Sequence, residues 1–96
     1  MVIRNDFRTY TYEIDNGFFV DVIIHPIKIK GKREQMGAEA YVYHEDYGVK
    51  EMVVGMLFNS TDFEQEIIEF MSGVEAMLDC AIQLYKSTYI NETNVF

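Results

Sequence analysis

The 96-residue sequence predicts an α+β protein, with a four-stranded antiparallel sheet followed by one long C-terminal helix packed on one face. Three observations predict this class. Apolar residues alternate at period two over residues 7–58, and they recur three and four positions apart over residues 61–90. Tight-turn sequences divide the first region into segments of strand length. A chain of this length is expected to form a single domain, 1–96, and its hydrophobic fraction of 49% is enough for one core.

The first two strands are expected at about residues 8–14 and 18–29 and form a predicted hairpin. Asp15-Asn16-Gly17 lies between them, and Asn-Gly accepts the positive φ that a tight hairpin turn requires. Pro26 has no backbone N–H to donate, so it implies a bulge or an edge position in the second strand. The apolar residues change parity at Ile27, which is consistent with a bulge.

The third and fourth strands are expected at about residues 38–44 and 49–58. Glu45-Asp46-Tyr47-Gly48 lies between them and has the composition of a tight turn. A simple meander is the expected strand order, because strands that follow each other in sequence usually pair. A polar loop at residues 31–35 joins the second strand to the third. With the two lysines just before it, this loop makes a small basic tip on an acidic chain.

The helix is expected over about residues 62–89. Thr61-Asp62-Phe63-Glu64 fits a capping box, in which the Thr and Glu side chains satisfy each other's backbone donors. An unbroken helix of this span is about 42 Å long, whereas a strand of seven or eight residues spans about 25 Å. The helix therefore overhangs the sheet or bends, and Ser72-Gly73 is the expected bend. The tail, residues 91–96, carries no pattern and is expected to fray. One apolar stripe of the helix holds Phe63, Ile67, Phe70, Met71, Val74, Met77, Leu78, Ala81 and Tyr85.

One helix covers only one face of a four-stranded sheet, so the strand residues divide into a covered face and a second face. The covered face is expected to hold Phe18, Val20, Val22, Ile24, Met52, Val54, Met56 and Phe58. The second face still carries Phe19, Ile23, Tyr41, Tyr43, Val53 and Leu57. Because monomers rarely expose large apolar patches, these six residues are predicted to form an interaction surface, and the chain is predicted to be a homodimer.

The formal net charge is −8, and no Lys or Arg occurs between Lys50 and Lys86. A surface of this charge repels a phosphate backbone, so nucleic acid is not expected as a partner. The acidic helix positions, among them Glu69 and Asp79, have two interpretations. They form a solvated surface that keeps the chain soluble, or they form a docking surface for a basic protein partner.

No residue pattern indicates catalysis, a cofactor or a metal. The two histidines, His25 and His44, have no second His or Cys at ligand spacing, and the helix holds no His that a carboxylate metal site needs. Gly-x-Ser-x-Gly and phosphate-binding Gly-rich loops are absent from the sequence. Cys80 falls within the apolar helical pattern and is expected to be a core or near-core thiol.

The expected compartment is the cytoplasm, without membrane association. A single cysteine excludes an internal disulfide framework, and the first residues lack the apolar run of a signal peptide. The apolar runs are a few residues long, far short of the roughly 20 that cross a membrane.

Two function classes remain. The first is a small non-catalytic protein-interaction protein of the accessory, inhibitor or immunity type, acting through its apolar sheet face or its acidic helix face. The second is a small-molecule-binding protein or enzyme, with a pocket lined by aromatic and Met side chains between sheet and helix or at a dimer interface. The first class is preferred, because the sequence holds no recognisable catalytic constellation.

Overall fold

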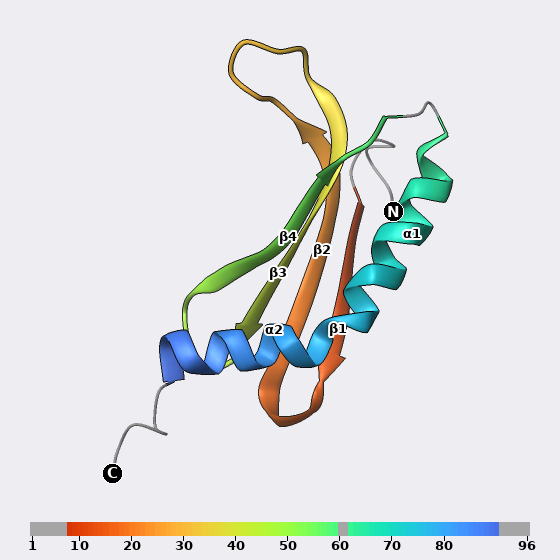
Figure 1. Cartoon of the computed structure of the whole chain (residues 1–96). Coiled ribbons are helices and arrows are strands. Elements are labelled where there is room, and N and C mark those ends of the chain that lie inside the picture. The colour runs from red at the N-terminus through yellow and green to blue at the C-terminus, as the bar shows by residue number, and fades with distance from the viewer. Residues whose placement is uncertain (1–7, 60–61, 91–96) are drawn as a thin grey trace.

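The computed structural model describes residues 8–59 and 62–90, in which an antiparallel sheet carries helices on one of its sides (Figure 1). Its strands are β1 (Arg8–Ile14), β2 (Phe18–Ile27), β3 (Gln35–His44) and β4 (Lys50–Leu57). They lie in the order β1-β2-β3-β4, so the predicted α+β class and the meander are confirmed. The predicted capping residue Thr61 and the tail 91–96 lie outside the described residues.

The turn between β1 and β2 has the backbone that Asn-Gly predicts. Asn16 and Gly17 adopt φ values of 68° and 82°. The positive φ favours glycine at position 17, and a Cβ there would also lie 2.8 Å from Oε2 of Glu45 and 2.9 Å from Nε2 of His44. His44 Nε2 lies 2.8 Å from the Asn16 carbonyl oxygen, and its Nδ1 accepts the Asp46 N–H at 3.1 Å. This imidazole therefore ties two neighbouring hairpin turns together, which is a structural role.

Of the two alternatives predicted for Pro26, a bulge or an edge position, the bulge is wrong. The pairing of β2 with β3 runs without a shift to Ile27 opposite Gln35. The described pairing of β2 with β1 ends earlier, at Ile24 opposite Arg8. Pro26 therefore lies beyond the described β1–β2 pairs, where its missing N–H removes no described hydrogen bond between them.

The bulge lies instead in β4. Ala40 pairs with Val54, but Tyr41 pairs with Met52, which leaves Val53 as the extra residue. One extra residue turns every earlier side chain of the strand to the opposite face. Met52, which was expected on the covered face, consequently shares the other face with Tyr41 and is 46% exposed.

The predicted single helix is two helices, α1 (Phe63–Ala76) and α2 (Leu78–Tyr85), followed by a π-helical turn, Lys86–Ile90. They meet at Met77, whose φ of −116° and ψ of 14° are not helical. The predicted bend site, Ser72-Gly73, lies within α1. The bend therefore exists, but at Met77.

The bend turns α2 across the ends of the strands instead of letting one helix overhang the sheet (Figure 1). Tyr85, at the end of α2, is 0% exposed, and its hydroxyl donates to the Val49 carbonyl oxygen at 2.8 Å. Its ring meets the Phe18 ring edge-on at 6.1 Å between centroids. Burial of this large ring against two strands gives a physical reason for the direction of α2.

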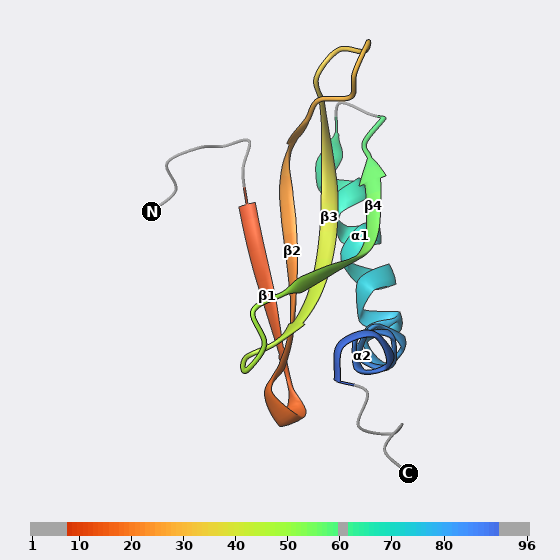
Figure 2. The same cartoon turned by 90° about the vertical axis from the view of Figure 1, so that its left-hand side faces the viewer.

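The core lies between the sheet and the helices (Figure 2). The predicted strand residues of the covered face fill it, apart from Met52. Cys80 is exposed, so the prediction of a core thiol is wrong. The predicted stripe continues through α2, where Ala81 and Tyr85 are buried together with Ile82, and Cys80 lies off this stripe. The helices contribute Ile67, Phe70, Val74, Ala81, Ile82 and Tyr85.

Candidate interaction surfaces

The side of the sheet that faces away from the helices is the first candidate surface, and we name it the open face (Figure 2). Strand pairing brings Phe19, Ile23, Tyr41, Tyr43 and Leu57 onto it, as predicted. Val53, the sixth predicted residue, is the extra residue of the bulge and packs against the core cluster. The open face also holds Thr11, Asp21, His25, Glu39, Lys50 and Met52.

An aromatic pair marks one end of the open face. Phe19 and Tyr43 are cross-strand partners whose rings stack with centroids 5.4 Å apart and planes at 15°. The Lys50 ammonium lies 4.5 Å from the centre of the Tyr43 ring, within the range of a cation–π contact. Both rings are half-buried, so each has one edge or face that a partner can reach.

A carboxylate holds this end of the face in place. Asp21 is 8% exposed and accepts hydrogen bonds from the Thr11 hydroxyl at 2.8 Å and the Lys50 ammonium at 2.9 Å. The Tyr43 hydroxyl donates to the same oxygen as Thr11, at 3.4 Å. The hydrogen bond to Asp21 raises the pKa of Lys50, and burial, followed by the Asp21 charge, raises the pKa of Tyr43. At neutral pH the cluster therefore holds one ion pair and a neutral phenol.

A second carboxylate of the open face, that of Glu39, contacts two neighbouring side chains. Glu39 lies 2.9 Å from Nε2 of His25 and accepts a hydrogen bond from the Tyr41 hydroxyl at 3.2 Å. Burial, followed by the Glu39 charge, raises the pKa of Tyr41. No group of three or more His, Cys, Asp and Glu side chains within residues 8–59 and 62–90 could hold a metal ion.

The acidic side chains of the helices do not form the single face that was predicted. Glu64 pairs with both terminal nitrogens of the Arg8 guanidinium on β1, which lowers the Glu64 pKa. Glu75 accepts a hydrogen bond from the Tyr12 hydroxyl at 3.0 Å, and burial together with this bond raises the pKa of Tyr12 to about 12. Glu69, which accepts a bond from Gln65 at 3.4 Å, lies instead beside β4.

Asp79 is exposed on α2, beyond the bend. The two predicted helix residues, Glu69 and Asp79, therefore belong to different helices. Each remains accessible, but the bend separates the surfaces that carry them.

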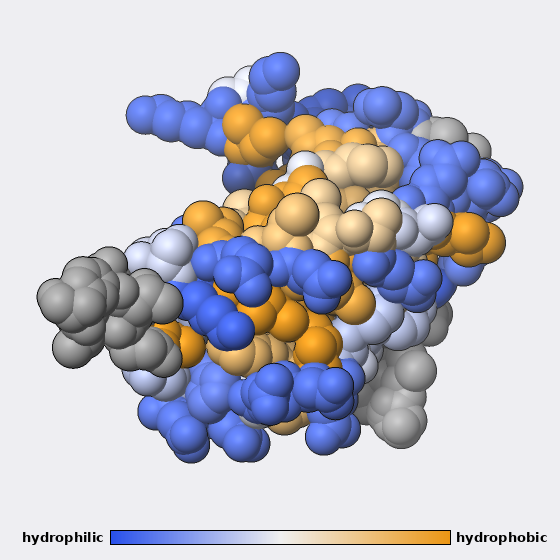
Figure 3. Space-filling view, turned by 60° about the horizontal axis from the view of Figure 1, so that its bottom comes forward, coloured by the Kyte–Doolittle hydropathy of each residue, from blue (hydrophilic) through white to orange (hydrophobic). Residues whose placement is uncertain are grey.

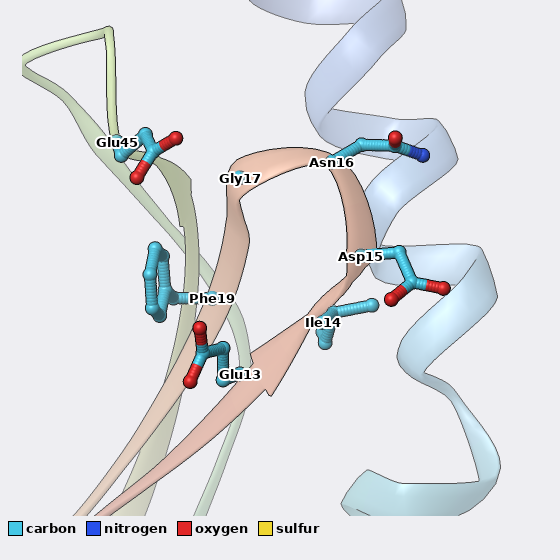
Figure 4. A pocket seen from close by; sticks show the side chains of 7 residues that line it. All are labelled: Glu13, Ile14, Asp15, Asn16, Gly17, Phe19 and Glu45. Carbon is cyan, nitrogen blue, oxygen red and sulfur yellow. The ribbon is translucent and has the colours of Figure 1, made fainter.

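The turns at one end of the sheet form an open pocket of about 420 Å³ (Figure 4). Figure 4 shows Glu13, Phe19 and Glu45 on one side of the β1–β2 turn, while Asp15 and Asn16 point away on the other. Three carboxylates and no Lys or Arg line the pocket. No sequence pattern predicted this site, because its residues come from the β1–β2 hairpin and from the separate turn that follows β3.

α1 lies along the sheet with a groove on each side. The groove on the β1 side measures about 400 Å³ and includes Glu64 and Glu75. The groove on the β4 side, which we name the β4 groove, measures about 200 Å³. Of these three hollows, the β4 groove is below the roughly 300 Å³ at which small-molecule pockets begin and the other two are above it, so volume does not decide and the small-molecule alternative stays a prediction. The β4 groove is lined by Val54, Met56, Glu69, Phe70, Gly73, Val74 and Met77.

The basic tip lies in the β2–β3 loop, at the other end of the sheet from the acidic pocket (Figure 1). Four of the eight Lys and Arg residues of the chain lie there, and all four are exposed. Gly31 turns the loop with a φ of 82°, and the Lys32 N–H donates to the Ile29 carbonyl oxygen at 2.9 Å. The four basic residues are Lys28, Lys30, Lys32 and Arg33.

No protein-family model, curated protein or solved structure matches the chain. No helix within the described residues is long and apolar enough to cross a membrane.

Proposed function

We propose that the chain is a non-catalytic protein-interaction protein of the accessory, inhibitor or immunity type, and that it binds through the open face. One observation carries this proposal: a stacked aromatic pair, fixed by the buried Asp21 carboxylate, lies on a sheet face that neither helix covers. Aromatic and Met side chains are enriched at the centres of protein interfaces, where a few of them supply most of the binding energy.

The hydrogen-bond network of the open face favours binding. The Tyr41 and Tyr43 hydroxyls donate to Glu39 and Asp21, so both rings are held in one orientation before a partner arrives. A side chain that is ordered in the free protein loses less entropy on binding. Met52 at the rim is flexible and 46% exposed, so it can adapt to a partner surface.

The first partner that we propose is a second copy of the chain. An isologous dimer would pair the two open faces and remove both apolar patches from water in one contact. If the chain is monomeric, the same face is left for a different protein. The face carries the carboxylates of Asp21 and Glu39, and only Asp21 is paired with the Lys50 ammonium, so a partner with a basic patch fits its charge.

A matched pair of variants tests the open face. Met52→Glu adds a charge to the open face, and Ile68→Glu adds the same charge at a 60%-exposed site on α1. Both positions are exposed, so both variants are expected to fold. In sedimentation velocity, wild type and Ile68→Glu should show dimers at concentrations where Met52→Glu is monomeric.

Pull-down experiments test the case in which the partner is a different protein. Pull-downs from the cells that produce the chain are compared for wild type, Met52→Glu and Ile68→Glu. Loss of a partner in Met52→Glu alone supports binding through the open face. If wild type is monomeric and all three chains recover the same partners, binding through this face is refuted.

A cytosolic location is part of the same proposal. Cys80 is exposed and is the only cysteine of the chain. An exposed thiol stays reduced in the cytosol, whereas an oxidising compartment would favour pairing between copies.

A further inference from the structure

The free edge of β4 lies directly beside the β4 groove. In the described sheet β4 pairs with β3 alone, so its other edge faces outward. The start of the strand is held from the helix side, where the Tyr89 hydroxyl donates to Glu51 at 2.6 Å. The part of the edge that lies next to the β4 groove is therefore the second half of the strand, from Val54 to Leu57.

The pairing pattern identifies the backbone groups of this edge. The Phe58 N–H donates to the Met36 carbonyl oxygen at 2.8 Å, so residue 58 is a hydrogen-bonded position of the β3–β4 ladder. Such positions alternate along an antiparallel pair, which places the N–H and C=O groups of Val54 and Met56 toward β3. The N–H and C=O groups of Gly55 and Leu57 then point away from the sheet. An added strand would find a donor and an acceptor at each of these two residues.

The β4 groove offers places for the side chains of such a strand. Val54 and Met56 form its floor and are half-buried, and Phe70, Val74 and Met77 form its wall. A Cβ on Gly73 would meet no atom within 4 Å, so the wall opens at that point. Figure 3 shows an apolar band, in orange and tan, between a hydrophilic arm and the hydrophilic side chains of the helices. Met side chains in such a groove can adapt to different apolar residues.

The charges at the ends of the groove restrict its occupant. Glu69 is the only charged residue among those that line it. The basic tip begins just beyond the end of β4 at Leu57, because Gln35, the first residue of β3 after the tip, bonds the Phe58 carbonyl oxygen at 2.6 Å. Its four cations make no ion pair with the described part of the chain. An occupant with acidic residues at the end beside the tip therefore has the complementary charge.

We propose that the edge of β4 and the β4 groove bind an extended peptide segment of a partner protein. The segment adds to β4 as a fifth strand and bonds the outward groups of Gly55 and Leu57. Its alternate side chains are apolar and enter the β4 groove, and its acidic residues lie beside the basic tip. This surface is separate from the open face, so it adds a second binding site to the proposed function.

Peptides of about eight residues, the length of a strand, test this site. Each peptide has alternating Val and Thr residues. Three versions are compared, with two Asp residues at the N-terminus, with two Asp residues at the C-terminus, and with no Asp. We expect an Asp-ended peptide to bind the ¹⁵N-labelled full chain and to shift the amide signals of Gly55 and Leu57. The signals of Phe19 and Tyr43 on the open face should move less.

Two variants of one residue separate strand addition from nonspecific binding. Gly55→Pro removes an outward N–H but no hydrogen bond to β3, so the sheet should persist, as circular dichroism can verify. It should weaken peptide binding about tenfold. Gly55→Ala keeps the N–H and should bind like wild type, since a Cβ there would lie 3.7 Å from its nearest neighbour, an ordinary contact.

A second pair of variants covers the case in which Gly55→Pro does not fold. Gly73→Phe fills the groove where there is space for a side chain, and Gly73→Ala leaves most of that space free. Only Gly73→Phe should lose peptide binding. Replacing Lys30 and Lys32 with Gln should remove the preference for the Asp-ended peptides and leave the uncharged peptide unaffected.

Several outcomes would overturn the proposal. One is that no peptide shifts these signals at about 1 mM, the limit of weak specific binding. Another is that the blocking variants bind like wild type. A third is that the free chain associates through this edge, seen as a dimer mass that Gly55→Pro abolishes, which would make a second copy the occupant. Met52→Glu on the open face should not change peptide binding, so failure of this proposal and failure of the proposed function are distinguishable.

Discussion

The two faces of the sheet come from the same strands but are built on different interactions. On the helix side, Val22, Ala38 and Val42 are completely buried and contribute only apolar atoms. On the open face, cross-strand contacts join rings to carboxylates, as in the cluster of Asp21 and Tyr43. Covering by helices stabilises the first face, whereas pairs of neighbouring side chains stabilise the second.

Asp21 illustrates how the open face buries a charged side chain. It lies between two core valines in sequence and is almost as buried as they are, with 8% of its surface exposed. Its carboxylate is hydrogen-bonded to Thr11, Tyr43 and Lys50, which all lie on the open face. A sheet face that the described helices do not cover can therefore still bury a charge, provided that the charge is paired and hydrogen-bonded.

The largest difference in the free energy of unfolding is expected between truncations of two adjacent residues, one on each face of the sheet. Ile24→Ala removes a side chain that is 1% exposed and should lower the free energy of unfolding by about 3 kcal/mol. Ile23→Ala removes the same atoms from the half-buried open face and should cost about 1 kcal/mol. Urea denaturation of both variants measures the difference. Equal losses would show that the open face is also covered in solution, as in a stable dimer.

A smaller loss of folding free energy is expected when the two carboxylates of the open face are removed one at a time. Asp21→Ala leaves the Lys50 ammonium and the Tyr43 hydroxyl without their acceptor and should cost about 2 kcal/mol. Glu39→Ala removes a more exposed carboxylate and should cost about 1 kcal/mol or less; the side chains are 11% and 21% exposed. Thermal or urea denaturation checks both values. A smaller loss for Asp21→Ala than for Glu39→Ala would contradict the role assigned to Asp21.

The smallest effect is a pH dependence on the helix side. The pKa of Tyr12 rises from 10.0 in the unfolded chain to about 12 in the fold. The folded state therefore holds this proton more tightly, so its contribution is complete below pH 10 and is lost as the pH rises toward 12. Solvent screening limits the loss to a few tenths of a kcal/mol.

Tyr12→Phe should reduce the loss of stability between pH 9.5 and 11.5, measured by urea denaturation. Tyr47→Phe is the control, because no hydrogen bond from the Tyr47 hydroxyl to a carboxylate occurs among the described residues. If both variants respond to pH like wild type, the bond from Tyr12 to Glu75 does not persist in solution.

Local patterns in the sequence determined the positions of the strands, one tight turn and most of the open face. The alternation of apolar residues located the strands, and the Asn16-Gly17 turn was predicted correctly because positive φ is a property of those residue types. Five of the six predicted residues of the open face lie on it, since period two assigns faces wherever a strand is regular. The cation-rich loop was likewise visible as a run of Lys and Arg.

The tertiary structure decided the features that depend on contacts between distant residues. The bulge at Val53 depends on how β4 pairs with β3, and it moved Met52 to the open face. The helix bends at Met77, near the place where the sheet ends and Tyr85 finds its site, although Ser72-Gly73 has the weaker helix propensity. The Asp21 cluster and the β4 groove each join residues from separate elements. No period or motif along the chain encodes such contacts, because packing and strand register are set by the whole fold.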